Sequence, residues 1–345
     1  MNRSKTGPKI ALVNDTRPGG HVGCILVMRR LCHGLGEAGC EVTAQLPLLK
    51  LSWATMADAV AGCDLLVVNG EGTLHHDGRG ALLIAKAVEQ AVAAGRPVAL
   101  INSVWQENKI AANVASSLSL VYTRESRSAA ALAALRVPAT VVPDLLLSAP
   151  AVVGLADFAP TPGSMAVFDH VNPRTAIFLA RFAMRHKAQF HSMAPRPSLR
   201  SFRTFVRYCR FMVRAGFPAP LRDDHLGQAL AAEIVITGRF HGACLAIAAG
   251  RPFVAIMSNT HKIEGMLEDA QLGEGAIVLK CLADARQLTE TIERAAGALR
   301  EVARDIRRLG AFREACTRYL ARAKGDSDQM FVALVKLAEE GRSRC

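Results

Sequence analysis

The chain has 345 residues, 50% of them apolar, and a formal net charge of +12. A chain of this length usually divides into two domains, and its apolar content is enough to pack both cores. No apolar run reaches the roughly 18 residues that cross a bilayer, and the basic N-terminus lacks the apolar stretch of a signal peptide. The nine cysteines form no CxxC pair, so we expect reduced thiols in a cytosolic protein and no zinc centre.

Short apolar runs alternate with helical stretches along the chain, a pattern typical of βαβ units with parallel sheets. In chain order the predicted strands are 9–14, 64–69, 97–102, 118–123, 140–142, 165–169, 187–193, 233–237, 252–257 and 276–279. The sequence therefore predicts an α/β fold with two Rossmann-like domains whose parallel sheets face each other across a cleft. We expect domains at 1–150 and 163–280, a proline-rich linker at 148–164, and a helical tail at 281–345 that packs across the domains or makes an oligomer contact.

The positive charge is concentrated in one segment. From His170 to Arg222 there are Lys and Arg residues but no Asp or Glu. Six of these arginines recur at steps of three and four, which places them on one stripe of a helix: Arg196, Arg200, Arg203, Arg207, Arg210 and Arg214. The Arg196–Arg214 helix predicts contact with an anionic membrane surface or a lipid-diphosphate carrier, and a solvated helix face is the alternative. Because no nucleic-acid motif is present, nucleic acid is not an expected partner.

An arginine and a histidine stand where a predicted strand passes into a buried helix, in the stretch ITGRFHG (236–242). Free backbone N–H groups and the helix dipole favour an anion at such a point. Arg239 adds a planar fork that fits carboxylate or phosphate, and His241 adds a donor or a proton source near neutral pH. The alternative is that Arg239 caps a nearby carbonyl and His241 is a core residue with satisfied hydrogen bonds.

The next predicted strand brings more polar residues to the same rim, because the carboxyl ends of parallel strands lie on one edge of a sheet. Ser258 and Asn259 follow that strand, and Lys262 begins another helix. Arginine, histidine and lysine together predict a site for a small, multiply charged anion.

The first half of the chain has its own candidate site in NGEGTLHHD (69–77). It is neither a Walker A loop nor GxGxxG, and adjacent histidines rarely face the same way, so a metal is not expected here. Asn69, Glu71, His75 and His76 are instead interpreted as acid–base or hydroxyl-binding groups. Alternatively, the two histidines simply begin the following helix, with Asp77 as its cap.

Two other strand ends carry candidate contact residues. Gly20 and His21 follow the first strand in PGGHVGC (18–24), and the glycines there suggest substrate contact. Trp105 follows the 97–102 strand, where an exposed indole would stack on a sugar; it would equally serve as a wedge between the domains.

In this order, the motifs resemble those of the polysaccharide pyruvyl transferase family. They are GGxxG (19–23), NGEG (69–72), YTRES (122–126), VVPDL (141–145), TGRFHG (237–242) and SNTHK (258–262). The family hallmark is Arg-x-His, a helix of small residues, a Gly-x-Pro turn and a lysine, which here are Arg239-Phe240-His241, Gly250-Arg251-Pro252 and Lys262. The resemblance covers roughly residues 10–275 and implies a two-domain fold similar to GT-B glycosyltransferases.

The resemblance implies transfer of the pyruvyl group of phosphoenolpyruvate to a sugar of a surface polysaccharide or its lipid-linked precursor, forming a ketal and releasing phosphate. The donor would lie on the second domain and the acceptor on the first. Arg239, Lys262 and Arg124 would hold the anionic groups, and His241 would bind phosphate or act as an acid. Glu71, His75 or His76 would serve the acceptor hydroxyls across the cleft, and Asp144 of VVPDL would contact substrate. No cofactor and no metal is required.

Two other functions stay open from the sequence. A GT-B glycosyltransferase could bind a nucleotide sugar, including a CMP-sugar, at the same helix N-terminus. A non-catalytic protein that binds a glycan or a lipid carrier is the second alternative. In each case the setting is capsule or exopolysaccharide assembly at the inner face of the membrane, and a homo-oligomer is compatible with it.

Overall fold

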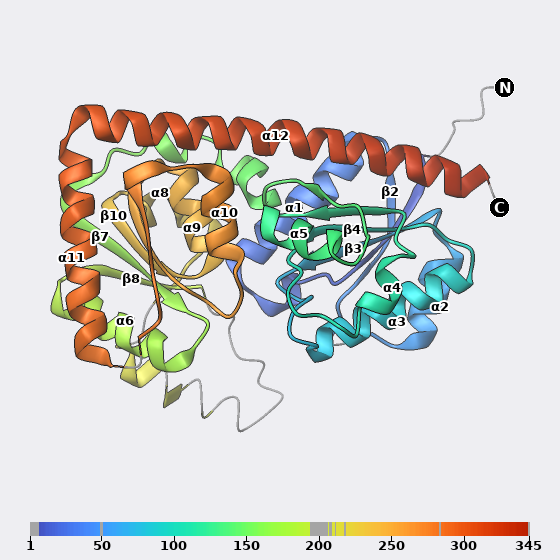
Figure 1. The fold of residues 1–345 in the computed structure, drawn as a ribbon, viewed down its shortest axis with the longest axis horizontal. Helices are drawn as coiled ribbons and strands as arrows, with labels where there is room; N and C mark the ends of the chain where they lie inside the picture. The colour runs from blue at the N-terminus through green and yellow to red at the C-terminus, as the bar shows by residue number, and fades with distance from the viewer. Residues whose placement is uncertain are drawn as a thin grey trace. The chain divides into compact units, whose positions relative to one another are not determined.

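The structure is a computed structural model that describes residues 7–48, 51–193, 206, 209–210, 212–216, 219–282 and 284–343. The chain forms two compact units, whose elements can be followed by colour in Figure 1. Unit 1 comprises Met1–Pro18, Val27–Ser148 and Arg322–Cys345, and unit 2 comprises Gly19–Leu26 and Ala149–Ala321. Each unit contains one parallel sheet with helices, so the predicted α/β class with two Rossmann-like sheets is confirmed.

The sheet of unit 1 has six parallel strands in the order β2-β1-β3-β4-β5-β6. The strands are β1 (Lys9–Val13), β2 (Glu41–Leu46), β3 (Leu65–Glu71), β4 (Val98–Ser103), β5 (Leu120–Thr123) and β6 (Thr140–Val141). The chain reverses its direction across the sheet between β1 and β3. Such a switch point is where open α/β sheets bind ligands, beyond the carboxyl ends of the strands.

The sheet of unit 2 also has six parallel strands, in the order β12-β11-β10-β7-β8-β9. They are β7 (Thr161–His170), β8 (Gln189–Ser192), β9 (Ala219–Pro220), β10 (Ala232–Gly238), β11 (Phe253–Ile256) and β12 (Ala276–Leu279). Renumbered within the unit, this is the 3-2-1-4-5-6 order of the Rossmann fold. Its switch point lies between β7 and β10, which are neighbours in the sheet (Figure 1).

Helices connect the strands in both units. In chain order they are α1 (Val22–Glu37), α2 (Trp53–Ala61), α3 (Arg79–Ala93), α4 (Ala112–Ala115), α5 (Ser126–Ala133), α6 (Pro173–Arg185), α8 (Leu226–Ala229), α9 (Phe240–Ala248), α10 (Lys262–Ala270), α11 (Ala285–Arg304) and α12 (Ile306–Ser343). Every residue of α9 is buried, as its run of small apolar residues predicts. In the described part of the chain, no helix is long and apolar enough to cross a membrane.

Two strands of the structure were not predicted. β2 reads EVTAQL and only its last residue is buried, because it lies at the edge of the sheet and therefore lacks a continuous apolar run. β9 is only two residues long. The predicted arginine stripe falls mostly outside the described residues, which include only Arg210 and Arg214 of its six arginines, both helical.

Apolar residues of α6 and α11 pack with the strands to form one core of unit 2. Alternate residues of β10 contribute to it, as expected for a period of two, and these are Ile234 and Ile236. Leu179 of α6 and Ile292 of α11 are fully buried in the same cluster. The long helix α12 closes part of unit 1, where Asp328 accepts a hydrogen bond from Arg30 at 2.8 Å and Phe331 lies under the same guanidinium.

His191 on β8 makes the stability of unit 2 depend on pH. Its ring lies 5.5 Å from that of Phe168, and burial lowers its pKa from 6.5 to about 4. Because the unfolded chain regains the ordinary pKa, the unfolded state binds an extra proton between these two values, so stability falls as the pH drops from about 6.5 to about 4.

Replacing this residue by phenylalanine should therefore flatten the pH dependence of stability in that window. Denaturant unfolding of His191→Phe and wild type at a series of pH values measures this. His33→Gln, at an exposed position, is the matched control and should keep the wild-type slope. Equal slopes for His191→Phe and wild type would show that the buried ring does not contribute.

Candidate functional site

The switch point of unit 2 is occupied by an ion pair. Asp169 is fully buried at the end of β7, and Arg239 directly follows β10 as the N-cap of α9. The guanidinium donates from Nε to Oδ1 at 2.8 Å and from Nη2 to Oδ2 at 3.1 Å. Ser192, at the end of β8, donates to the same carboxylate at 3.1 Å. This bidentate geometry fixes the plane of the guanidinium, and it does not use Nη1, which could donate a hydrogen bond to a ligand.

The backbone around this arginine is also held in place. The hydroxyl of Thr237 accepts a hydrogen bond from the N–H of Arg239 at 3.0 Å and donates to its carbonyl at 3.1 Å. Gly242 lies against Thr237, and a side chain there would collide with that hydroxyl. Packing at the start of the helix therefore requires glycine at position 242.

His170, the last residue of β7, has both ring nitrogens engaged. Its Nδ1 accepts from the N–H of Asn172 at 2.8 Å, so its Nε2 donates to the carbonyl of Met257 at 3.0 Å. Burial lowers the pKa of this imidazole, which fits the neutral tautomer. Gly238 makes room for the ring, because a Cβ at that position would collide with it. His170 thus connects the end of β10, where its ring packs on Gly238, to Met257 just after β11.

His241 is buried in the first turn of α9. Its ring centroid lies 5.3 Å from that of His21, at the start of α1. A side chain on Gly23 would collide with the His241 ring, so the glycine allows the two helix starts to approach each other. Burial lowers the pKa of His21 well below its ordinary value, and the nearby His241, Arg239 and Lys262 lower it further.

Lys262 is buried at the first position of α10, and its Nζ donates to Asn259 Oδ1 at 3.1 Å. Ser258 donates to the same oxygen at 3.0 Å. Arg239 and Lys262 both lower the pKa of His21 and the pKa of His170. The two predicted cations therefore lie close to the same pair of histidines in unit 2. Positive charge and helix N-termini together suit an anion.

The switch point of unit 1 is built differently, around a buried carboxylate. Glu71 ends β3 with φ of 39°, a left-handed conformation that is strained for a residue with a side chain. Its Oε1 accepts from Thr16 Oγ1 at 2.6 Å and from Asn69 Nδ2 at 3.1 Å. Asn14, just after β1, donates to the Asn69 carbonyl at 2.6 Å. The carboxylate is thus held rigidly by groups from the two strands that flank the switch point.

The two histidines after this strand do not begin α3, which starts at Arg79. Instead Nδ1 of His75 and Nδ1 of His76 lie 2.9 Å apart, and His75 pairs with Gln106 in an isolated bridge. His76 is exposed and lies 3.5 Å from Glu107. Asp77 caps no helix but accepts from the N–H of Ile110 at 2.8 Å.

The expectation of an exposed tryptophan on the rim is wrong. Trp105 is only 3% exposed and belongs to the apolar core of unit 1. Its backbone N–H donates to Ser128 Oγ at 2.7 Å. The indole follows β4 but is part of that core, so it is not available on the rim to stack on a sugar.

Arg124 and Asp144 form a second buried ion pair, with Nη1 3.2 Å from Oδ2. Their side chains are 2% and 0% exposed. Burial raises the pKa of Asp144 while Arg124 opposes the rise, and the carboxylate also accepts from the N–H of Leu146 at 3.0 Å. The structure places both residues inside unit 1, where they tie the end of β5 to the segment after β6.

Gly20 is exposed with φ of 72°, which only glycine adopts without strain. Sequence reasoning missed Asp169, Thr16 and the packing role of Gly23. Asp169 could have been found, because it ends a predicted strand just as Arg239 follows one. The collision at Gly23 could not be read from sequence, since it involves a residue more than two hundred positions away.

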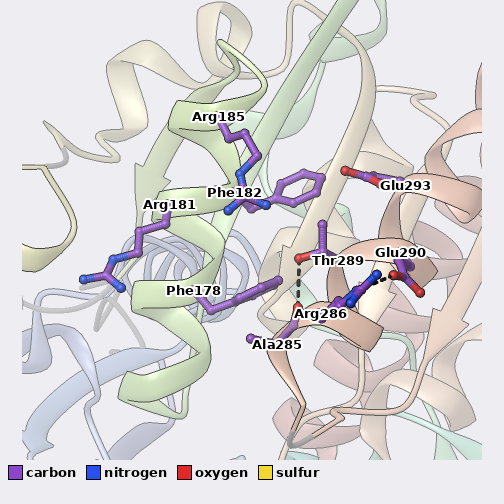
Figure 2. A pocket seen from close by; sticks show the side chains of 9 residues that line it. All are labelled: Phe178, Arg181, Phe182, Arg185, Ala285, Arg286, Thr289, Glu290 and Glu293. Carbon is purple, nitrogen blue, oxygen red and sulfur yellow. Dashed lines mark hydrogen bonds and ion pairs between the residues drawn. The ribbon is translucent and has the colours of Figure 1, made fainter.

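A cavity of about 550 Å³ lies elsewhere in unit 2, between α6 and α11 (Figure 2). Phenylalanine rings form part of its lining, and arginines and glutamates surround them. The lining residues are Phe178, Arg181, Phe182, Arg185, Ala285, Arg286, Thr289, Glu290 and Glu293. No predicted site residue is among them. Arg286 and Glu290 of α11 form an ion pair, with Nε 3.1 Å from Oε1.

The sequence of this chain matches a protein family. A sequence model described as polysaccharide pyruvyl transferase matches residues 23–260. No curated protein matches the chain in sequence.

Three solved structures share the fold at low sequence identity. S. aureus MnaA with UDP is 11% identical, over 89% of this chain and 91% of that chain, with a TM-score of 0.56. Methanocaldococcus jannaschii UDP-GlcNAc 2-epimerase in complex with UDP-GlcNAc and UDP is 12% identical, over 83% and 92%, with a TM-score of 0.53. An alpha-glucosyltransferase in complex with UDP and a 13-mer DNA is 10% identical, over 96% and 100%, with a TM-score of 0.52. These likenesses concern the fold alone and confirm that it is GT-B-like.

The contact between Gly23 and His241 yields a prediction for packing. Gly23→Ala should destabilise the protein by about 1–3 kcal/mol, because the new methyl group overpacks the site and displaces the imidazole. Gly36→Ala on the same helix is the matched control, since a Cβ there meets no atom within 4 Å; it should be neutral or stabilising by up to about 1 kcal/mol. Denaturant unfolding measures both, and equal stabilities of the two variants would contradict the predicted collision.

Proposed function

Because this chain belongs to the polysaccharide pyruvyl transferase family and is thus a transferase, we propose that it moves the pyruvyl group of phosphoenolpyruvate onto a sugar. The acceptor is a sugar of a surface polysaccharide or of its lipid-linked precursor. The products are a ketal and inorganic phosphate. The observation that carries this proposal is the oriented guanidinium of Arg239 at the switch point of unit 2, with Lys262 and His241 near it.

Phosphoenolpyruvate carries a carboxylate and a phosphate, so it needs at least two cationic contacts. Arg239 presents Nη1 after Asp169 has bound Nε and Nη2, and Lys262 supplies a compact ammonium. The N-termini of α9 and α10 add backbone N–H groups and the positive ends of two helix dipoles. Arg124 is left out of this donor set, because Asp144 binds it within the interior of unit 1.

The reaction begins with a proton delivered to the methylene carbon of phosphoenolpyruvate, which becomes the methyl group and leaves positive charge at the central carbon. A first sugar hydroxyl attacks that carbon and gives up its proton to a base. The C–O bond to phosphate then breaks, and the proton taken from the first hydroxyl passes to the departing oxygen, so that phosphate leaves as hydrogen phosphate. A second hydroxyl attacks the same carbon and closes the ketal, and its proton restores the acid that protonated the methylene carbon. His241 is proposed either to bind the phosphate or to supply the first proton.

Glu71 is the proposed base for the acceptor hydroxyls. Its carboxylate is buried, and hydrogen bonds from Thr16 and Asn69 fix one of its oxygens. The strained backbone at this residue is a feature that folds keep at functional sites. His75 and His76, farther along the same loop, are proposed to bind the acceptor rather than to transfer protons, because each ring is already engaged by the other.

The setting of the reaction follows from the acceptor. A lipid-linked precursor places the enzyme at a membrane surface, and the Arg196–Arg214 stripe supports this part of the proposal from sequence only. The structures similar in fold were solved with UDP or UDP-GlcNAc, so nucleotide sugars are the donors against which phosphoenolpyruvate has to be compared.

Loss of Arg239 should weaken donor binding. In isothermal titration, Arg239→Ala and Arg239→Lys should bind phosphoenolpyruvate roughly 10- to 100-fold more weakly than wild type, because a hydrogen bond to a charged group contributes about 1.5–3 kcal/mol. The lysine variant keeps the charge and so separates the bidentate geometry from charge alone. Arg222→Ala, an exposed arginine of the same unit, is the control and should bind normally. Unchanged affinity in both Arg239 variants would refute its role.

Loss of Glu71 should affect the chemical step instead. In Glu71→Gln the rate of ketal formation should fall about 10²- to 10⁴-fold, as expected for removal of a general base, while phosphoenolpyruvate still binds. Rates measured against pH with a competent acceptor test this. Glu89→Gln, at an exposed carboxylate of α3, should keep full activity. If Glu71→Gln changed only the KM for the acceptor, the residue would be a binding group and not the base.

A further inference from the structure

Three potential metal ligands meet at the starts of two helices in unit 2. His21 directly precedes α1, Cys24 lies in its first turn, and His241 lies in the first turn of α9. One ligand atom from each residue lies within 4.8 Å of the other two. His21 and Cys24 are three positions apart, a spacing that brings side chains to the same face of a helical turn.

The chemistry of these ligands selects a particular class of ion. Thiolate and imidazole together favour Zn²⁺ and similar borderline-soft cations over Mg²⁺ or Ca²⁺, which prefer oxygen. In a tetrahedral zinc site with bonds of about 2.0–2.3 Å, neighbouring ligand atoms are about 3.3–3.8 Å apart. The observed separations of up to 4.8 Å therefore need an adjustment of about 1.5 Å at most, which side-chain rotation can provide.

Two further observations support the same site. Nδ1 of His21 is buried and has no hydrogen-bond partner, which costs about 1–3 kcal/mol unless something binds it. Gly23 lies between His21 and Cys24 in the chain, and any side chain there would collide with the His241 ring. The missing Cβ is what lets the histidine of α9 reach the two ligands of α1.

We propose that His21, Cys24 and His241 bind one Zn²⁺-like cation through three ligands, with a fourth coordination position open. Three protein ligands with one open position are typical of zinc sites that admit an exogenous ligand. The proposal revises the expectation from sequence that the cysteines form no zinc centre, which rested on the absence of CxxC. No step of the reaction above needs the ion, but the ion and the reaction share His241. A histidine whose ring nitrogen binds the ion cannot supply the first proton from that nitrogen, so the protein with the ion bound lacks this acid.

Cobalt(II) provides a direct test, because a cobalt–thiolate bond gives a charge-transfer band in the near ultraviolet. The metal-free full-length protein is titrated with Co²⁺ without oxygen, and Zn²⁺ is then added to displace it. We expect a thiolate band that saturates at one ion per chain and disappears on addition of Zn²⁺. Mass spectrometry of the gel-filtered protein counts the bound zinc.

Variants identify the ligands. Cys24→Ser should abolish the thiolate band, and His21→Asn should weaken Co²⁺ binding by at least about 100-fold. Cys32→Ser, at a second half-buried cysteine of α1, is the matched control and should bind Co²⁺ like wild type, as should His33→Gln at an exposed histidine of the same helix. Thermal unfolding confirms that each variant is folded. Absence of a band in wild type, or a band that survives Cys24→Ser, would overturn the proposal.

Discussion

The ion pair between Arg239 and Asp169 is the interaction on which the proposed donor site of this protein depends. Removing both charges from water costs several kcal/mol per ion, and the cost is offset here by two parallel hydrogen bonds and a third from Ser192. The carboxylate of Asp169 has no exposed surface, so water cannot replace the hydrogen bonds that Arg239 donates to it. Breaking such a pair typically destabilises a protein by about 3–5 kcal/mol. The fold therefore holds the guanidinium in one orientation before any ligand binds.

The same physical rule places the polar groups of both units. Each sheet reverses its strand order once, and the side chains that follow the two strands at that point converge. In unit 2 these residues make a cationic site around Arg239, and in unit 1 they make a rigid acidic site around Glu71. Glycines provide the space for these side chains. A Cβ at position 238 would collide with the ring of His170, and a Cβ at position 70 would collide with the side chain of Ser103. One unit thus suits an anion, and the other suits hydroxyl groups.

Much of the fold could be predicted from sequence, because strands buried on both faces are continuous apolar runs. The predicted strand at 276–279 coincides with β12, whereas the edge strand β2 was missed since half of its positions are polar and exposed. The positions of Arg239 and Lys262 at helix starts were predicted, because Arg239 directly follows β10 and Lys262 begins the helix that comes after β11. What could not be predicted is which side chains pair across the sheet: Asp169 binds Arg239 only because β7 and β10 become neighbours. The burial of Trp105 is likewise set by the shape of the core and not by its place after β4.

The proposed function requires that phosphoenolpyruvate, and not a nucleotide sugar, is the donor. The most direct measurement incubates the wild-type protein with phosphoenolpyruvate, UDP-sugars and a panel of sugar acceptors, and follows phosphorus NMR together with the mass of each sugar. We expect that inorganic phosphate appears in an amount equal to that of a sugar that has gained a pyruvate ketal, while the UDP-sugars stay intact. Transfer of a sugar from a UDP-sugar, with phosphoenolpyruvate unconsumed, would contradict it.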